Sequence, residues 1–98
     1  MRVVWTHQAQ VMLDEAVDYI AAERPVSALR WLDEAMERVR SLEHFPDLGR
    51  SIPELQRPEI REVLVDPYRV PYHRDDQQVT ILAVLHDRRL FDLVGLDE

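Results

Sequence analysis

Residues 61–86 read REVLVDPYRVPYHRDDQQVTILAVLH, and this stretch contains three successive strand signals. Residues 61–66 are rich in Val and Leu, residues 68–74 alternate apolar and polar side chains, and residues 79–86 are almost continuously apolar. The polar residues 75–78 predict a tight turn, so we expect the last two strands to pair antiparallel. We place the apolar run at the centre of the sheet, because a strand covered on both faces carries few polar residues.

The residues before this stretch predict one short strand and two helices. The β-branched and aromatic residues 2–6 are typical of a strand, and Thr6 is a good cap for a helix over residues 7–23. Pro25 suits the first turn of a second helix that runs to about Phe45. Each helix has an apolar stripe at helical spacing, formed by Ala9, Leu13, Ala16, Val17 and Ile20 and by Ala28, Leu32, Ala35, Val39 and Leu42. The short connection makes the pair an antiparallel hairpin.

Residues 46–60 separate the helices from the strands and read as a loop. The segment PDLGRSIPELQRPEI contains three of the prolines and one of the two glycines. Loops of this length are uncommon in a small domain and often carry function.

The order of elements predicts an α+β fold, β-α-α-β-β-β, in a single domain over residues 1–98. The helical hairpin must bury its apolar stripes, and one face of a small antiparallel sheet is the available surface. The opposite face of the sheet is then expected to be open and available for binding.

The expected strand pairing places several polar residues on that open face. If Arg74 pairs with Val79, continuing the same register pairs Arg69 with Val84, and paired residues share a face. The side chains expected on the open face are then those of Arg69, His73, Thr80, Leu82, Val84 and His86. A slip of one residue would reverse this assignment. Pro71 cannot donate to the ladder, which predicts a sheet edge or a bulge beside it.

Composition limits the possible functions. The chain has no Cys, which excludes disulfides, thiolate catalysis and Cys-ligated zinc and is typical of a reducing compartment, so we expect a cytoplasmic protein. No apolar run is long enough for a signal peptide or a membrane span, so no membrane partner is expected. The formal net charge of −7 disfavours non-specific binding to nucleic acid, although all 12 basic residues are Arg, which suits local recognition of phosphate or carboxylate.

The residues that could perform chemistry are Arg69, His86, Arg88 and Arg89. His86 could exchange protons near neutral pH, and the arginines could stabilise charge on a phosphorane during RNA cleavage. The structural alternative is that His86 bonds to backbone while the arginines pair with Asp66, Asp87 or Asp92, and such pairs are common. The four histidines show no metal-ligand spacing, and the chain lacks a phosphate-binding glycine loop, so we expect no metal and no cofactor.

Along residues 2–90 the chain resembles the ParE/RelE superfamily of toxins from bacterial type II toxin–antitoxin pairs. The similar segments are the early Trp5 strand, YIAAERPVSALRWLDEAMERVRSLEHFP, PDLGRSIPEL, REVLVDPYRVPYH and VTILAVLHDRR. The resemblance implies the same β-α-α-β-β-β fold. It also implies a cognate antitoxin whose C-terminal segment wraps the toxin in a hetero-oligomer.

Two branches of the superfamily imply different targets. The spacing of Pro46, Gly49, Arg50, Pro53 and Glu54 is similar to ParE-like toxins, which poison DNA gyrase and lack nuclease chemistry. RelE-like toxins cut mRNA in the ribosome, and Arg69 with Arg88 or Arg89 matches their strand arginines. The chain departs from that second pattern: it has no Lys, and Phe91 or Leu93 stands where a late Tyr is expected.

We therefore expect a ParE-like toxin that binds DNA gyrase and is not an enzyme. One alternative is a ribosome-dependent mRNA endoribonuclease that uses Arg69, His86 and Arg88. The other is a degenerate toxin that acts mainly as an antitoxin-binding or autoregulatory partner. The residues expected to contact target or antitoxin are Arg50, Glu54, Arg69, His73, Leu82, His86, Arg88 and Arg89.

Overall fold

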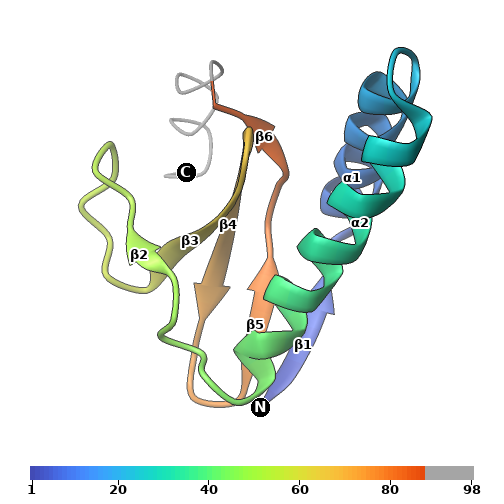
Figure 1. Ribbon diagram of the computed structural model, residues 1–98. Helices are drawn as coiled ribbons and strands as arrows, with labels where there is room; N and C mark the ends of the chain where they lie inside the picture. The colour runs from blue at the N-terminus through green and yellow to red at the C-terminus, as the bar shows by residue number, and fades with distance from the viewer. Residues whose placement is uncertain (88–98) are drawn as a thin grey trace.

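The computed structural model describes residues 1–87. Two helices, α1 and α2, lie side by side over one face of a twisted sheet (Figure 1). The elements, in chain order, are β1 (Arg2–Trp5), α1 (His7–Ala21), α2 (Pro25–Arg40), a single 3-10 turn (Ser41–Glu43), β2 (Arg50–Ser51), β3 (Ile60–Val65), β4 (Tyr68–Arg74), β5 (Gln78–Ile81) and β6 (Leu85–His86). The expected α+β fold with a helical hairpin on one sheet face is confirmed.

The sheet is mixed, which corrects the expectation that all its strands are antiparallel. The strand order is β1-β5-β4-β3-β2, and β6 pairs with β4 beyond the end of β5. The N-terminal strand β1 runs parallel to β5, while the other pairs are antiparallel. Parallel pairing is possible because the helices and the later strands all lie between β1 and β5 in the chain, which gives a crossover of sufficient length.

Both helices begin where the sequence predicts. The Oγ1 of Thr6 accepts a hydrogen bond from the N–H of Ala9 at 3.0 Å, so the predicted cap is confirmed. Pro25 is the first residue of α2, but this helix ends at Arg40 and continues as the 3-10 turn, whereas the stripe had suggested an end near Phe45. Helix ends commonly tighten in this way because the last carbonyl groups lack partners further along the helix.

The main core lies between the helices and the sheet. Four alanines of the helices are almost completely buried, which lets the helices approach the large side chains of β4 closely. Trp31 of α2 is also buried, and its Nε1–H donates to the carbonyl oxygen of Val65 at 3.0 Å. Its ring lies 5.0 Å from that of Tyr68, centroid to centroid. The alanines are Ala9, Ala16, Ala28 and Ala35.

A second, smaller core covers part of the opposite face of the sheet. Ile52 and Leu55, from the proline-rich loop, are 1% and 8% exposed and pack with residues of β3 and of the chain around β6. The expectation that this face is open was therefore wrong over this region. The loop carries apolar side chains of its own, and folding back over the sheet removes them from water. The partners of Ile52 and Leu55 are Ile60, Ala83 and Leu85.

The pairing of the last strands contains a bulge that the sequence had indicated only in general terms. Arg74 pairs with Val79 as expected, but Arg69 pairs with Leu85 and Tyr68 with His86. The expected Arg69–Val84 pairing is wrong by one residue. The N–H of Leu82 donates to the carbonyl oxygen of Pro71 at 3.0 Å where the ladder is interrupted, as the missing donor of Pro71 predicted. His86 is consequently on the helix-covered face, opposite to Arg69.

No helix within residues 1–87 is long and apolar enough to cross a membrane.

Candidate functional site

Arg69 is the centre of a buried ion-pair network. Arg69 is 3% exposed, and Glu62 on the neighbouring strand β3 is 1% exposed. The Nε of Arg69 donates to Glu62 at 2.7 Å, and Nη1 and Nη2 donate to the two carboxylate oxygens of Glu54 at 2.8 and 3.0 Å. The hydrogen bonds that Arg69 donates to Glu54 and Glu62 raise the pKa of Arg69, so it remains a cation. The expectation of an accessible Arg69 is wrong, because its donors are occupied within the chain.

Arg50 extends this network to the edge of the sheet. Its Nε donates to Oε2 of Glu62 at 2.8 Å, and its side chain is 53% exposed. Arg50 on β2, Glu62 on β3, Arg69 on β4 and Glu54 in the loop therefore form one connected chain of charges. The network fixes the proline-rich loop to three strands, since buried charges are stable only when paired.

The pKa of Glu54 is lowered, chiefly by the hydrogen bonds from Arg69. A carboxyl group with a lowered pKa in the folded state stabilises the fold above its ordinary pKa of 4.5, which it has in the unfolded chain. This stabilisation is lost as the pH falls through the lower pKa of the folded state. We expect stability to decline below about pH 4.5 less steeply in Glu54→Gln than in the wild type. Urea unfolding at several pH values measures this difference.

The wild type and Glu54→Gln must be compared because Glu59 and Asp75 also have lowered pKa values and therefore also make stability depend on pH. Both remain in the variant, so their contributions cancel in the difference. Parallel pH profiles for the wild type and Glu54→Gln would show that the Glu54–Arg69 pair does not contribute.

The loop before β2 is held by the hydroxyl group of Tyr72. This hydroxyl accepts a hydrogen bond from the N–H of Gly49 at 2.9 Å and donates to the carbonyl oxygen of Pro46 at 2.7 Å. Nη1 of Arg61 donates to the carbonyl oxygen of Gly49 at 2.8 Å. Residues 46–49 are therefore fixed to the sheet by side chains of β3 and β4, and burial raises the pKa of Tyr72 so that its hydroxyl keeps its proton.

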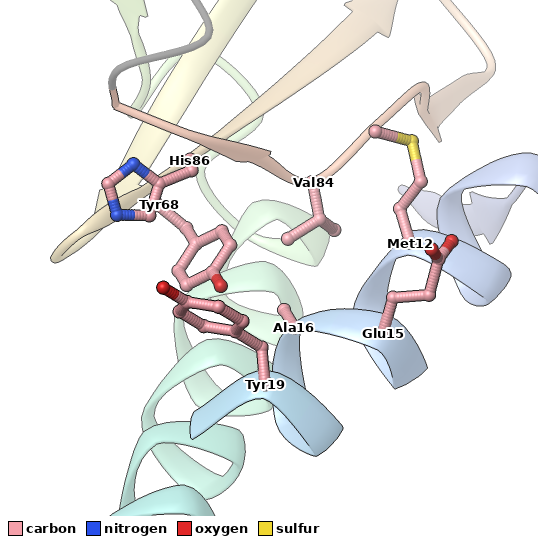
Figure 2. A pocket seen from close by; sticks show the side chains of 7 residues that line it. All are labelled: Met12, Glu15, Ala16, Tyr19, Tyr68, Val84 and His86. Atoms are coloured by element: carbon pink, nitrogen blue, oxygen red, sulfur yellow. The ribbon is translucent and has the colours of Figure 1, made fainter. Parts of the chain in front are cut away.

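A groove lies between α1 and the end of the sheet where β4 meets β6 (Figure 2). It encloses about 410 Å³. Tyr19 projects from α1 toward Tyr68 of β4, and the ring of His86 is 5.3 Å from the ring of Tyr68. Burial raises the pKa of Tyr68, so its hydroxyl remains protonated. The lining residues are Met12, Glu15, Ala16, Tyr19, Tyr68, Val84 and His86.

The groove combines apolar walls with a few polar groups and is suited to binding a peptide segment. Tyr19 is 74% exposed, so a large aromatic surface is available to a partner. Helix α1 carries Asp14, Glu15 and Asp18 and has no Lys or Arg. A complementary segment would therefore have apolar anchors and basic flanking residues.

The predicted site residues fall into three groups. Arg50, Glu54 and Arg69 come together in the ion-pair network, and His73 and Leu82 lie on the same side of the sheet, paired with or packed against residues of the second core. His86 is on the other side, in the groove. Arg88 and Arg89 lie outside the described residues.

Sequence reasoning missed the groove and the central carboxylate. Leu64 pairs with Arg69 in the β3–β4 hairpin, and Glu62 is two residues from Leu64, so strand periodicity places Glu62 on the face of Arg69 once this pairing is known. Tyr19 lies outside the apolar stripe of α1, and an aromatic residue on an exposed helix position is a weak signal of a contact site. His86 and Tyr68 share a face only because the bulge shifts the pairing by one residue, and the sequence did not show where that shift occurs.

Within residues 1–87, His, Asp and Glu side chains form no group of three that could hold a metal ion.

Comparisons with known proteins agree with this fold. The model of the family described as "ParE toxin of type II toxin-antitoxin system, parDE" matches residues 3–91. A solved structure described as "Chromosomal ParDE TA system from P. aeruginosa" is similar with a TM-score of 0.73 and 24% sequence identity. The match covers 88% of this chain and 95% of that chain, and at this identity it shows the fold. No protein with a curated description matches the chain.

Proposed function

This chain belongs to the ParE toxin family of type II toxin–antitoxin systems, and we propose that it arrests growth by binding DNA gyrase until an antitoxin neutralises it. The family match over residues 3–91 is the observation that carries the proposal. The cognate antitoxin would form a hetero-oligomer with the chain, and we place its C-terminal segment in the groove between α1 and β6.

The groove supports this placement of the antitoxin. An amphipathic segment can lay apolar side chains against Met12, Tyr68 and Val84, which form the groove walls. Tyr19 offers a ring that becomes buried on binding, and aromatic residues of this kind often contribute much of the binding energy. The acidic side of α1 favours a segment that carries Arg or Lys next to its apolar anchors.

The described geometry gives no support to the nuclease alternative. Arg69 and His86 are on opposite faces of the sheet, and each of the three guanidinium nitrogens of Arg69 donates to Glu54 or Glu62. A general acid or base must lie within hydrogen-bond reach of the group with which it exchanges a proton. Arg69 and His86 therefore do not form one catalytic centre. The third residue of the proposed set, Arg88, lies outside the described residues.

A supercoiling assay tests the proposed function. The purified chain should inhibit purified DNA gyrase, and the antitoxin encoded beside its gene should restore supercoiling. Tyr19→Ala should weaken antitoxin binding about tenfold, because it removes an exposed aromatic anchor from the groove. Isothermal titration calorimetry measures that change.

Leu29→Ala is the matched control for the groove variant. Leu29 is 63% exposed on α2, outside the groove, so its removal should leave antitoxin affinity unchanged. Gyrase that supercoils normally at saturating toxin would reject the target. Equal antitoxin affinity for Tyr19→Ala and the wild type would reject the placement in the groove.

A further inference from the structure

The turn after α2 presents two large apolar side chains to solvent. Phe45 is 64% exposed and Leu48 is 58% exposed. The N–H of Leu48 donates to the carbonyl oxygen of Phe45 at 3.0 Å, which closes a tight turn and keeps the two residues close together. Neither residue belongs to either core cluster. Single exposed apolar residues are ordinary on protein surfaces, but a close pair on one fixed turn is a candidate contact site.

The surrounding chain holds this turn in place. The Tyr72 hydroxyl is hydrogen-bonded to the backbone of Pro46, which follows Phe45, and of Gly49, which follows Leu48. The N–H of Phe45 donates to the carbonyl oxygen of Ser41 at 3.0 Å, which ties the turn to the end of the helical hairpin. Because these bonds already order the backbone, binding through Phe45 and Leu48 costs little further conformational entropy.

Asp47, between the two apolar residues, points its carboxylate toward the sheet. Oδ1 of Asp47 lies 3.0 Å from Nε of Arg74 and 3.8 Å from Nε of Arg61. Asp47 is the only charged residue of the turn, residues 45–48, and its carboxylate is paired with arginines of this chain. The Asp47 side chain is still 61% exposed. A partner at this turn therefore meets the apolar side chains of Phe45 and Leu48 together with one carboxylate that is already paired with arginine.

Arg50 supplies a cation beside the apolar pair. It follows Leu48 by two residues, and its side chain is 53% exposed. Its Nε is bonded to Glu62, but within residues 1–87 its two terminal nitrogens make no hydrogen bond. These nitrogens could bind a carboxylate of a partner through charge-assisted hydrogen bonds.

We propose that Phe45, Leu48 and Arg50 form the surface through which this chain grips the protein whose activity it blocks. The partner surface is an apolar pocket with a carboxylate at its edge. Aromatic residues and Arg are enriched among the residues that dominate binding energy, and pre-organised anchors bind most efficiently. This inference rests on the proposed function, which states that the chain arrests growth by binding a target protein. It adds the place on the chain where that target binds.

The proposed target surface is separate from the groove assigned to the antitoxin. Tyr68 lines the groove, whereas Tyr72 supports the turn, and four residues of a strand span roughly 13 Å. Figure 1 shows β6 beside one end of β4 and the connection from α2 to β2 at the other end of β4. The groove residues Tyr68 and His86 belong to the end where β4 pairs with β6. Changes in the turn can therefore be tested without altering the groove.

The test uses the double variant Phe45→Ser/Leu48→Ser in the full chain. Both side chains are exposed, so we expect the fold to persist, and antitoxin affinity by calorimetry checks that it does. The matched control is Val26→Ser/Leu29→Ser, which removes two apolar side chains that are 62% and 63% exposed on α2. The turn variant should require at least about tenfold more protein than the control to inhibit purified DNA gyrase and to arrest growth on induced expression.

The gyrase and growth readouts separate this inference from the proposed function. If the wild type arrests growth without inhibiting gyrase, the gyrase target is rejected, and loss of growth arrest in the turn variant alone still supports the target surface. A turn variant that binds antitoxin and arrests growth as well as the control overturns the inference. A wild-type chain that does not arrest growth overturns both proposals.

Discussion

Arg69→Met is expected to lower the free energy of unfolding by about 3–5 kcal/mol, because it leaves a buried carboxylate without its main partner. Glu62 is 1% exposed, and of its side-chain hydrogen bonds within residues 1–87 only the one from Arg50 would remain. The Met side chain fills part of the volume of Arg69, so loss of packing is a smaller contribution than loss of charge compensation. Urea unfolding at neutral pH measures the change.

A second variant separates charge from packing in this network. Arg69→Met/Glu62→Leu removes both buried charges, and replacing a buried ion pair with apolar groups is often close to neutral. We expect the double variant to recover most of the stability lost by Arg69→Met alone. The other partner, Glu54, has a side chain that is 29% exposed and can be hydrated when Arg69 is absent. If the double variant is no more stable than the single one, an uncompensated charge on Glu62 is not the cause of the loss.

Gly49→Ala is expected to lower the free energy of unfolding by about 2–4 kcal/mol, through overpacking and a disturbed hydrogen bond. A Cβ atom on Gly49 would lie 2.6 Å from Cε1 of Tyr72 and 2.7 Å from the carbonyl oxygen of Glu62. Tyr72 is completely buried and cannot move aside without disturbing the main core. Thermal and urea unfolding both report this loss.

Two controls identify the cause of the Gly49→Ala effect. Ser51→Ala changes an exposed residue of β2 and should alter stability by no more than about 0.5 kcal/mol. Tyr72→Phe removes the hydroxyl group without adding an atom. It should lower the free energy of unfolding by about 1–3 kcal/mol, because the N–H of Gly49 and the carbonyl oxygen of Pro46 lose their shared partner. A Gly49→Ala loss no larger than that of Tyr72→Phe would mean that the collision adds nothing beyond the broken hydrogen bonds.

The ion-pair network also explains why the most prominent candidate residue has a structural role. Arg69 is a cation in an alternating strand, and its residue type alone is compatible with phosphate binding. Its actual partners are Glu62, which is close by in the β3–β4 hairpin, and Glu54, which comes from the loop that folds over the sheet. The hairpin pairing was accessible from the sequence, but the position of the loop was not.

Most of the local elements could be predicted from the sequence alone. Residues 68–74 form the predicted strand without change, Thr6 and Pro25 begin the helices as expected, and Pro71 indicates the region of the bulge. These features depend on side-chain periodicity, capping and missing donors, all of which act between residues close in the chain. For the same reason the order of the main helices and strands could be predicted. The prediction was wrong in two places: the short strand β2 lies in the segment predicted as a loop, and the strand predicted over residues 79–86 is divided into β5 and β6.

Which residues share a surface depended on how distant parts of the chain pack together. The bulge after Ile81 moved His86 to the helix side, where it meets Tyr68 and Tyr19 in the groove. The loop that carries Ile52 and Leu55 covered the face that the strand pattern had left open. Both outcomes depend on contacts between residues far apart in the chain, and in a sheet a shift of one residue exchanges the two faces.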